Sequence, residues 1–310
     1  MTGPYASIPA RVTICEVGPR DGLQNEATSV PAAAKIRYIE MLADAGIAAI
    51  EATSFVSAAA VPQLADADEV YPAIRKRPGV RYIALVPNER GLDRALAAGV
   101  QEIAVFTAAS ESFARRNIRM SIDDSLATFE RIIARAHARD RTIRASISTA
   151  FGCPFEGAVP VSAVVRIAKA LLAAGADSLS IADTIGVATP NRVVEVTAAL
   201  LDAGIPLERF GLHFHDTRGT GVANVMAGLQ MGVREFDASA GGLGGCPFAP
   251  GATGNVATED VLYLLHGMGV ETGIDIDRVR DASRFIGGIL TGRLASRAYF
   301  AMEATAALGG

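Results

Sequence analysis

Two histidines, His213 and His215, lie two positions apart in the stretch Leu212-His-Phe-His-Asp216. We expect this stretch to end a β-strand, in which alternate side chains face the same way, so both imidazoles would point to one side. Each neutral imidazole offers a ring-nitrogen lone pair, and two of them on one rigid face form half of a divalent-metal site. Chance spacing, or two hydrogen-bonded strand histidines, would explain the pattern equally well. The chain has only four histidines, however, and two of them are here.

Oxygen ligands that would complete such a site occur far away in the sequence. Asp21 lies in a glycine-containing segment near the N-terminus, and Asn255 follows the last expected strand. A mixed set of nitrogen and oxygen ligands favours Mg²⁺, Mn²⁺ or a similar divalent cation, with positions left open for substrate oxygens. An aspartate flanked by glycine is more often a turn former, so the spacing of Asp21 alone carries little weight.

Arg20, beside Asp21, is a candidate for binding or stabilising a negatively charged group of a substrate. A guanidinium there could bind a carboxylate or stabilise a developing enolate oxygen. The alternative is a surface arginine that pairs with Glu16 or Glu51. These two carboxylates are expected in strands and could be buried partners that hold Arg20 in place.

The glycine-rich segment Gly241-Gly-Leu-Gly-Gly-Cys-Pro247 allows three interpretations. It could cradle a phosphate, form a plain turn, or act as a mobile flap that carries the thiol of Cys246. The segment lacks the lysine and serine or threonine of a P-loop. A thiol on a flap can move a proton near neutral pH. Buried, inert side chains are the simplest interpretation of Cys15 and an alternative for Cys153.

The elements that must position these residues repeat along the chain. An alanine-rich helix end, a glycine and an apolar strand recur at Gly46, Gly99, Gly175 and Gly232, and a glycine past a helix favours a left-handed cap. Eight strands are predicted, at residues 12–17, 47–51, 82–86, 102–106, 143–149, 178–183, 210–215 and 235–239. Short apolar strands that alternate with helices predict parallel pairing, and eight such units predict an α/β TIM (β/α)₈ barrel.

Helix boundaries support this count. Thr189-Pro190 is typical of a helix start, and Ser121 with Asp124 resembles a capping box. Further helical patterns lie at residues 256–267 and 275–302, and the second suggests a C-terminal helical appendage that closes the bottom of the barrel or pairs subunits. We expect one domain over residues 1–310, with the barrel at about 11–270 and the appendage at about 271–310.

Composition excludes several classes of function. The chain has 310 residues, half of them hydrophobic, and a net charge of −4 without a run of lysine or arginine, which argues against nucleic acid as a partner. Three cysteines argue against a disulfide framework. We see no secretory signal and no apolar stretch long enough to span a membrane. We therefore expect a soluble, cytoplasmic protein.

In TIM barrels, functional residues lie where the strands end and in the loops that follow. The polar residues of this chain fall in those places: Glu16 and the segment after it, Glu51, Asp183, both histidines, the glycine segment, Asn255 and Glu259. A barrel would therefore bring them to one rim.

Three long motifs resemble the hydroxymethylglutaryl-CoA lyase family of the DRE-TIM metallolyase superfamily. They are Glu16-Val-Gly-Pro-Arg-Asp-Gly-Leu-Gln-Asn-Glu26, the stretch around the two histidines, and Gly241-Gly-Leu-Gly-Gly-Cys-Pro-Phe248. Shorter phrases such as Glu51-Ala-Thr-Ser-Phe-Val-Ser57 and Gly152-Cys-Pro-Phe-Glu-Gly157 also resemble that family. The similarity covers residues from about 11 to about 290.

The resemblance implies roles for particular residues. It implies a divalent cation, Mg²⁺ or Mn²⁺, with Asp21, His213, His215 and Asn255 as ligands. It places Arg20 and Cys246 in catalysis, and His213 or Asp21 would be the base. Supporting or substrate-binding positions are Glu16, Gln24, Glu51, Ser54, Asn117, Ser180, Asp183 and Glu259.

The implied reaction is cleavage of 3-hydroxy-3-methylglutaryl-CoA to acetyl-CoA and acetoacetate, a step of leucine and ketone-body metabolism. The expected partner is an acyl-CoA substrate, and the apolar C-terminal helices suggest a homodimer or higher homo-oligomer. Three alternatives remain: a lyase for a related 3-hydroxyacyl-CoA, a Claisen-type condensing enzyme of the same superfamily, and a non-catalytic metal-binding scaffold. The intact Arg20, Asp21 and Cys246 argue against the last.

Three positions depart from members of the family. Ala27 replaces a lysine, Ser146 replaces a tyrosine and Thr149 replaces a cysteine that some relatives carry. These positions are expected to border the acyl pocket or its surroundings. They leave the metal chemistry unchanged, but they keep open a larger or differently branched acyl group.

Overall fold

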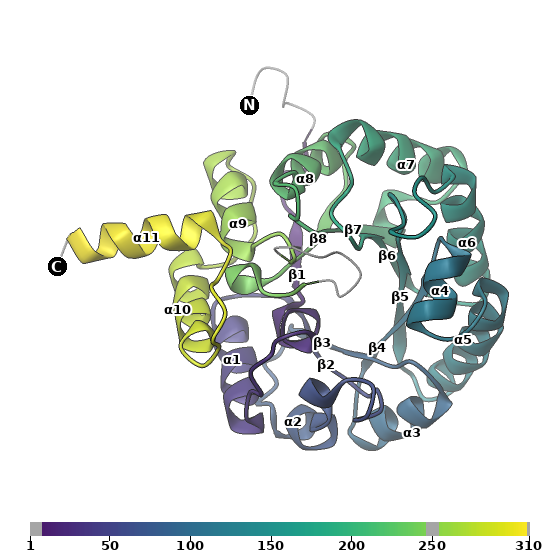
Figure 1. Cartoon of the computed structure of the whole chain (residues 1–310), viewed down its shortest axis with the longest axis horizontal. Helices are drawn as coiled ribbons and strands as arrows, with labels where there is room; N and C mark the ends of the chain where they lie inside the picture. The colour runs from purple at the N-terminus through teal and green to yellow at the C-terminus, as the bar shows by residue number, and fades with distance from the viewer. Residues whose placement is uncertain (1–7, 246–253, 309–310) are drawn as a thin grey trace.

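The computed structural model describes residues 8–245 and 254–308 and has the predicted barrel architecture. Eight parallel strands pair in sequence order, and β1 closes the ring against β8 (Figure 1). The strands are β1 (Thr13–Glu16), β2 (Ala49–Ser54), β3 (Arg81–Leu85), β4 (Glu102–Ala108), β5 (Thr142–Ser148), β6 (Ser178–Asp183), β7 (Phe210–Phe214) and β8 (Glu235–Ala238). The TIM (β/α)₈ prediction is therefore confirmed.

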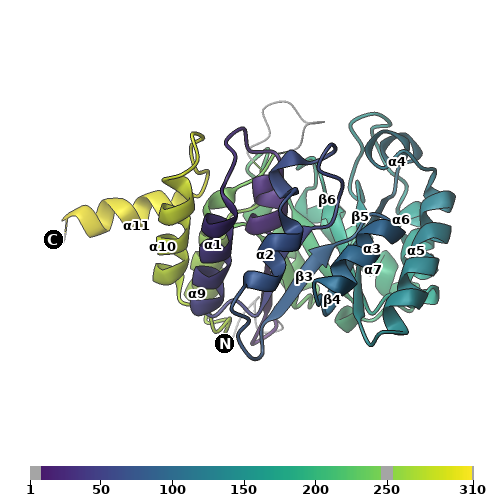
Figure 2. The same cartoon turned by 90° about the horizontal axis from the view of Figure 1, so that it is seen from below.

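A ring of helices covers the outside of the barrel (Figure 1). They are α1 (Ala32–Asp44), α2 (Ala67–Ala73), α3 (Glu89–Ala97), α5 (Ile122–His137), α6 (Val161–Ala173), α7 (Pro190–Asp202), α8 (Gly221–Gln230) and α9 (Thr258–Gly267). The short helix α4 (Glu111–Asn117) lies in the connection between β4 and α5, at the end of the barrel rather than in this ring (Figure 2). The four glycines of the recurring phrase all have positive φ, as the cap prediction requires. Ser121 caps α5, because its hydroxyl accepts a hydrogen bond from the backbone N–H of Asp124 at 3.0 Å.

Strand alternation divides the side chains into two sets. Residues such as Leu179 and Ile181 face the helices and join the large core between the two layers. Residues of the other parity, including Cys15 and Ala49, pack inside the barrel as a small second cluster. Which set a polar residue belongs to decides whether it can reach the barrel mouth.

An irregularity in β2 changes this alternation at a useful place. The register of β2 against β3 shifts between Glu51 and Thr53. A bulge of this kind inserts one residue and turns the following side chains to the other face. As a result Glu51 and Ser54, three positions apart, both line the same pocket.

The C-terminal helical pattern forms two helices. They are α10 (Ile276–Gly287) and α11 (Arg297–Leu308). Helix α10 packs against α1 and α9 at the side of the barrel, so the expected closure of the barrel bottom is wrong. Helix α11 contacts α9 and α10 and then projects away from the body (Figure 2). Among the described residues, no helix is both long and apolar enough to cross a membrane.

Candidate active site

A pocket of about 350 Å³ opens at the end of the barrel where the strands terminate. Its walls come from segments distant in sequence, because parallel strands bring their carboxyl ends to one rim. Among the residues that line it are Arg20, Asp21, Gln24, Glu51, Ser54, Asn117, Ser180, His213 and His215. The predicted meeting of these side chains at one rim therefore holds for most of them.

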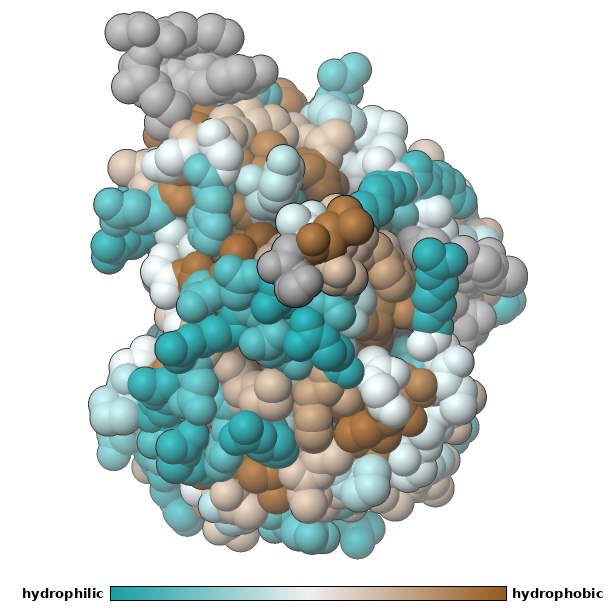
Figure 3. Space-filling view, turned by 90° about the vertical axis from the view of Figure 1, so that its left-hand side faces the viewer, coloured by the Kyte–Doolittle hydropathy of each residue, from teal (hydrophilic) through white to brown (hydrophobic). Residues whose placement is uncertain are grey.

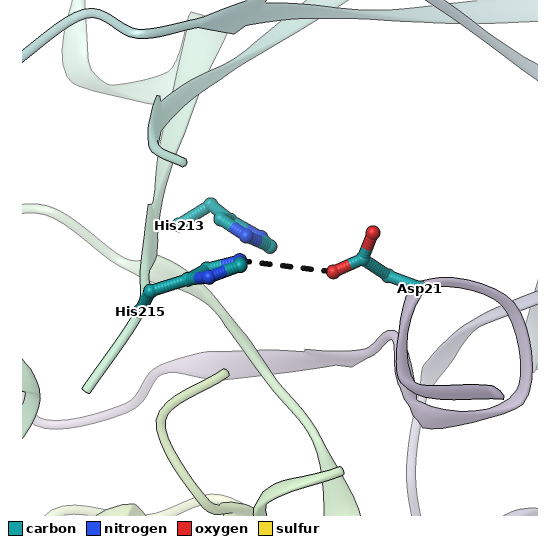
Figure 4. Close-up of side chains that lie close together, drawn as sticks. All are labelled: Asp21, His213 and His215. Carbon is teal, nitrogen blue, oxygen red and sulfur yellow. Dashed lines mark ion pairs between the residues drawn. The ribbon is translucent and has the colours of Figure 1, made fainter. Parts of the chain in front are cut away.

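Three of the predicted ligands converge inside this pocket. Asp21, His213 and His215 offer ligand atoms that all lie within 4.8 Å of one another. Both imidazoles extend from the end of β7 toward Asp21 (Figure 4). His215 Nε2 lies 3.8 Å from Asp21 Oδ2. The expectation that alternate residues of this strand share a face is met.

Asp21 reaches the cluster on a single π-helical turn, η1 (Gly18–Gly22), that follows β1. Gly18 makes this turn possible, because a Cβ atom there would lie 2.6 Å from both Glu16 Oε1 and Tyr38 Oη. Short π-helical turns of this kind are frequent at functional sites.

Asn255 lies beside the same cluster. It forms an isolated antiparallel bridge with His215, and its side-chain Nδ2 lies 2.9 Å from Asp21 Oδ2. The same amide nitrogen donates to the carbonyl oxygen of Leu243 at 3.0 Å. Within the described part of the chain, Asn255 Oδ1 and His215 Nδ1 are buried polar atoms without a hydrogen-bond partner. Two imidazoles, a carboxylate and an unpaired amide oxygen suit a hard-to-borderline divalent cation.

The local charges favour ionised Asp21. Burial opposes the charge of Asp21, but Arg20 and both histidines together hold the pKa of its carboxyl well below the usual range. Burial likewise opposes protonation of His213, but a hydrogen bond and charge interaction with Asp237 raise its pKa. Asp21 is thus an anion over the whole physiological range, as a metal ligand must be.

Arg20 is held at the pocket wall by Glu51. Its Nε lies 2.8 Å from Glu51 Oε1 and its Nη2 lies 3.1 Å from Oε2, so the contact has two donors and two acceptors. Its Nη1 also donates to Asp21 Oδ1 at 2.8 Å. Burial opposes the charge of Arg20, but Glu51 and Asp21 raise its pKa above the usual value. The guanidinium of Arg20 therefore stays charged beside Asp21, His213 and His215.

Three predicted supporting residues do not line the pocket. Glu16, Asp183 and Glu259 are fully buried behind it, on the side of the helices. Glu16 follows the inward-facing Cys15, and Asp183 follows the inward-facing Ala182, so alternation turns both carboxylates outward. The expected pairing of Glu16 with Arg20 is wrong, and of these two carboxylates it is Glu51 that holds the arginine.

These carboxylates instead fix the loops at the rim. Glu16 accepts hydrogen bonds from the backbone N–H groups of Gly18 and Ala240, at 2.8 and 2.9 Å. Glu259 accepts from the N–H of Gly241 at 2.9 Å, and Asp183 accepts from two amides in the loop after β6. Because the amides of Ala240 and Gly241 are engaged in this way, they cannot also cradle a phosphate.

The buried carboxyls at Glu16 and Glu259 give a testable pH dependence. Burial raises the pKa of each to about 7. A carboxyl whose pKa is higher in the folded than in the unfolded state stabilises the fold at low pH, and this contribution is lost as the pH rises through 7. Glu259→Gln should therefore reduce the fall in unfolding free energy between pH 5.5 and 8 by about 2 kcal/mol.

Urea unfolding at a series of pH values measures this difference. Glu271→Gln, at an exposed carboxylate that pairs with Arg11, is the matched control and should keep the wild-type slope. Equal pH slopes for wild type and Glu259→Gln would contradict the prediction.

Two buried residues that the sequence did not single out also belong to the site. Asp237 in β8 lines the pocket, and Arg144 in β5 donates to it at 2.6 Å. Burial opposes the charge of Asp237, but Arg144 and His213 lower its pKa to about 2. The sequence did contain a signal for Asp237. Glu235 and Asp237 are two positions apart in a predicted strand, so both side chains lie on the same face, and charged residues so placed indicate a polar barrel interior.

Of the remaining predictions, Cys246 lies outside the described residues. Cys15 and Cys153 are buried and free, which fits the simplest interpretation of Cys15 and the alternative given for Cys153. Ser146 lines the pocket, whereas Thr149 is fully buried and does not.

Comparison with known proteins gives one consistent result. The HMGL-like family model matches residues 11–286. The mitochondrial hydroxymethylglutaryl-CoA lyase of Gallus gallus is 45% identical over 291 residues, which cover 94% of this chain and 97% of that protein.

Solved structures agree with the sequence comparison. The crystal structure of hydroxymethylglutaryl-CoA lyase from Pseudomonas aeruginosa has a TM-score of 0.94 and 46% identity, covering 96% of this chain and 99% of the other. An HMG-CoA lyase from Acinetobacter baumannii, in complex with coenzyme A and 3-methylmalate, has a TM-score of 0.89 and 38% identity, with coverage of 96% and 95%.

Proposed function

The chain belongs to the HMGL-like family, and from this membership we propose that it is a metal-dependent carbon–carbon lyase that cleaves 3-hydroxy-3-methylglutaryl-CoA to acetyl-CoA and acetoacetate. The observation that carries the proposal is the convergence of Asp21, His213 and His215 beside Arg20 in one pocket. A retro-Claisen cleavage needs this combination, because one oxygen must lose a proton while another gains negative charge.

We propose Asp21, His213, His215 and Asn255 as the ligands of a Mg²⁺ or Mn²⁺ ion. The unpaired buried Asn255 Oδ1 and the short separations within the cluster support this set. When bound, such a cation would lower the pKa of the substrate C3 hydroxyl and hold it beside a second substrate oxygen.

The protein side chains would then carry the reaction as follows. A base takes the proton of the C3 hydroxyl, and the two candidates that face the pocket are His213 and Asp21. The electron pair of the O–H bond forms the ketone of acetoacetate, and the C2–C3 bond breaks. The electron pair of that bond moves to the thioester, which becomes the enolate of acetyl-CoA.

Arg20 is the group that we propose to stabilise this enolate oxygen. Glu51 orients its guanidinium through two hydrogen bonds, so little reorganisation is needed when charge develops. Protonation of the enolate carbon completes the cleavage. We propose Cys246, beyond the described residues, as the donor of that proton.

A related acyl group remains an alternative for one specific reason. Ser146 lines the pocket, and a serine leaves more room than a larger side chain would. Apolar residues, among them Leu85, Phe106 and Phe113, form the neighbouring wall. A 3-hydroxyacyl-CoA with a larger apolar branch would therefore be a second substrate class. That an acyl-CoA is the substrate is supported by the Acinetobacter baumannii lyase with coenzyme A.

Turnover of purified protein with Mg²⁺ tests the function. Acetyl-CoA should be released from 3-hydroxy-3-methylglutaryl-CoA, and a panel of other 3-hydroxyacyl-CoA thioesters compares acyl groups. Incubation with acetyl-CoA and 2-oxo acids serves as the control for a condensing enzyme. Release of free CoA in that control, with no cleavage of any 3-hydroxyacyl thioester, would overturn the proposal.

We also propose a homodimer or higher homo-oligomer that uses the face formed by α9, α10 and α11. This face exposes Tyr263, Phe300 and Leu308, and Figure 3 shows apolar patches between polar side chains on it.

We propose separately that the protein is cytoplasmic, although the chicken relative is mitochondrial. The free thiols of Cys15 and Cys153 support a reducing compartment.

A further inference from the structure

Asp237 lies inside the barrel, directly below the predicted metal ligands. Its side chain is 3% exposed, and its Oδ2 lies 3.1 Å from Nδ1 of His213. The same oxygen accepts a hydrogen bond from Ser180 Oγ at 3.0 Å. Asp237 is thus the partner of Nδ1 of His213, the ring nitrogen that faces away from Asp21 and His215.

A second buried residue holds Asp237 in place. Arg144 is 1% exposed, and its Nη2 donates to Asp237 Oδ1 at 2.6 Å. Arg144 Nε lies 3.3 Å from Glu235 Oε1, and Glu235 pairs in turn with Arg81 at 2.8 Å. Alternating charges therefore extend from Asp237 toward the bottom of the barrel, so that Asp237 is neither unpaired nor free to rotate.

This arrangement restricts the chemistry of His213. An ionised carboxylate can only accept hydrogen bonds, so His213 Nδ1 must carry a proton. In the neutral ring the lone pair is then on Nε2, the nitrogen left for the cluster with Asp21 and His215. His215 differs, because its Nδ1 has no hydrogen-bond partner among the described residues.

We propose that Asp237 is a positioning residue that fixes the Nδ1–H tautomer of His213 and so presents Nε2 to the cation, with Arg144 holding the carboxylate. The inference rests on the proposed metal site and adds two residues to it. A carboxylate behind a metal-binding histidine sets both the tautomer and the ring orientation. It also argues against His213 as the base, because neither of its ring nitrogens would keep a free lone pair.

Asp237→Asn is the informative variant. Arg144 has no acceptor, so it should bind the amide oxygen of the new asparagine and turn its NH₂ group toward His213. His213 Nδ1 would then have to accept, and the proton would move to Nε2, where it blocks coordination. The same substitution behind a catalytic histidine elsewhere leaves the geometry intact but selects the wrong tautomer.

Nitrogen NMR of the metal-free full-length protein reads this tautomer directly. The chain has only four histidines, so ¹⁵N-histidine labelling gives few signals, and His137→Gln and His266→Gln remove two of them. At alkaline pH, where the imidazoles are neutral, wild-type His213 should be the Nδ1–H form and Asp237→Asn the Nε2–H form. Ser180→Ala removes the other hydrogen bond to the same carboxylate oxygen and should keep the wild-type tautomer.

Mn²⁺ titration by calorimetry supplies the second readout. Asp237→Asn should raise the Kd for Mn²⁺ by roughly 10- to 100-fold, and Ser180→Ala by less than this range. An Nε2–H tautomer in wild type would overturn the proposal whether or not the variant folds, as would unchanged Mn²⁺ affinity in Asp237→Asn. The tautomer is measured without cation or substrate. Failure to cleave any thioester would therefore contradict the proposed function but not the role of Asp237.

Discussion

Replacement of Arg20 by glutamine is expected to lower kcat for cleavage by on the order of 10²-fold or more while the cation stays bound. Arg20 is the cationic side chain that borders the pocket beside the ligand cluster, and both its donors to Glu51 are already engaged before substrate arrives. Glutamine keeps a hydrogen-bond donor but loses the charge that would stabilise an enolate oxygen. Steady-state assays with saturating Mg²⁺ measure the effect.

The design must separate catalysis from stability. Arg20→Gln leaves Glu51 buried without its partner, which is costly for a folded protein. The double variant Arg20→Gln with Glu51→Gln removes both charges and should recover stability but not turnover. Arg166→Gln, at an exposed arginine that pairs with Asp123, is the control and should have wild-type kcat. Turnover within about threefold of wild type in Arg20→Gln would remove this residue from the role assigned to it.

Removal of divalent cations is expected to have the larger effect. Chelator-treated protein should lose at least about 10³-fold in turnover, because the C3 hydroxyl would have to ionise without help, and Mg²⁺ or Mn²⁺ should restore it. Full activity after complete removal would defeat the mechanism. A matched pair of variants, His215→Gln in the cluster and His137→Gln outside it, distinguishes the site from non-specific binding.

Cation binding should also stabilise the fold. A ligand that binds only the folded state at 100 times its Kd adds about 2.7 kcal/mol to the unfolding free energy. Wild type and His137→Gln should gain this stability on addition of Mn²⁺, whereas His215→Gln should gain much less. Equal gains in all three proteins would place the cation elsewhere.

The barrel could be predicted because its signal is repeated and local. A glycine past each of four helices and eight short apolar runs depend only on neighbouring residues, and the left-handed caps at Gly46 and Gly175 bear this out. The same locality explains the error at the C-terminus. The helical pattern at residues 275–302 predicted the helices that are α10 and α11, but a local pattern does not show that α10 packs against α1 and α9 at the side of the barrel.

Residues of the pocket could be predicted from the sequence only where it was clear which face of the strand each side chain occupies. His213 and His215 are two apart, so wherever the strand ends they share a face, and they meet Asp21 as expected. Glu16 and Asp183 lie at the ends of strands, but their side chains point outward from the barrel. Because side chains alternate along a strand, the inward-facing neighbours Cys15 and Ala182 would have placed both carboxylates correctly.

Other features required the three-dimensional structure. The bulge that brings Ser54 to the same wall as Glu51 has no mark in the sequence. The contacts of Asp237 with His213 and Arg144 join three different strands, whose neighbours around the ring become known only when the barrel closes. Long-range pairing of this kind is set by topology rather than by local pattern.

Anomalous diffraction from crystals grown with Mn²⁺ tests the central claim most directly. We expect one strong peak at the barrel mouth, with Asp21, His213, His215 and Asn255 each contributing an atom within about 2.5 Å, the range of hard-cation bonds. A peak at another place, or one that is bound by Asp21 while both histidines point away, would contradict it.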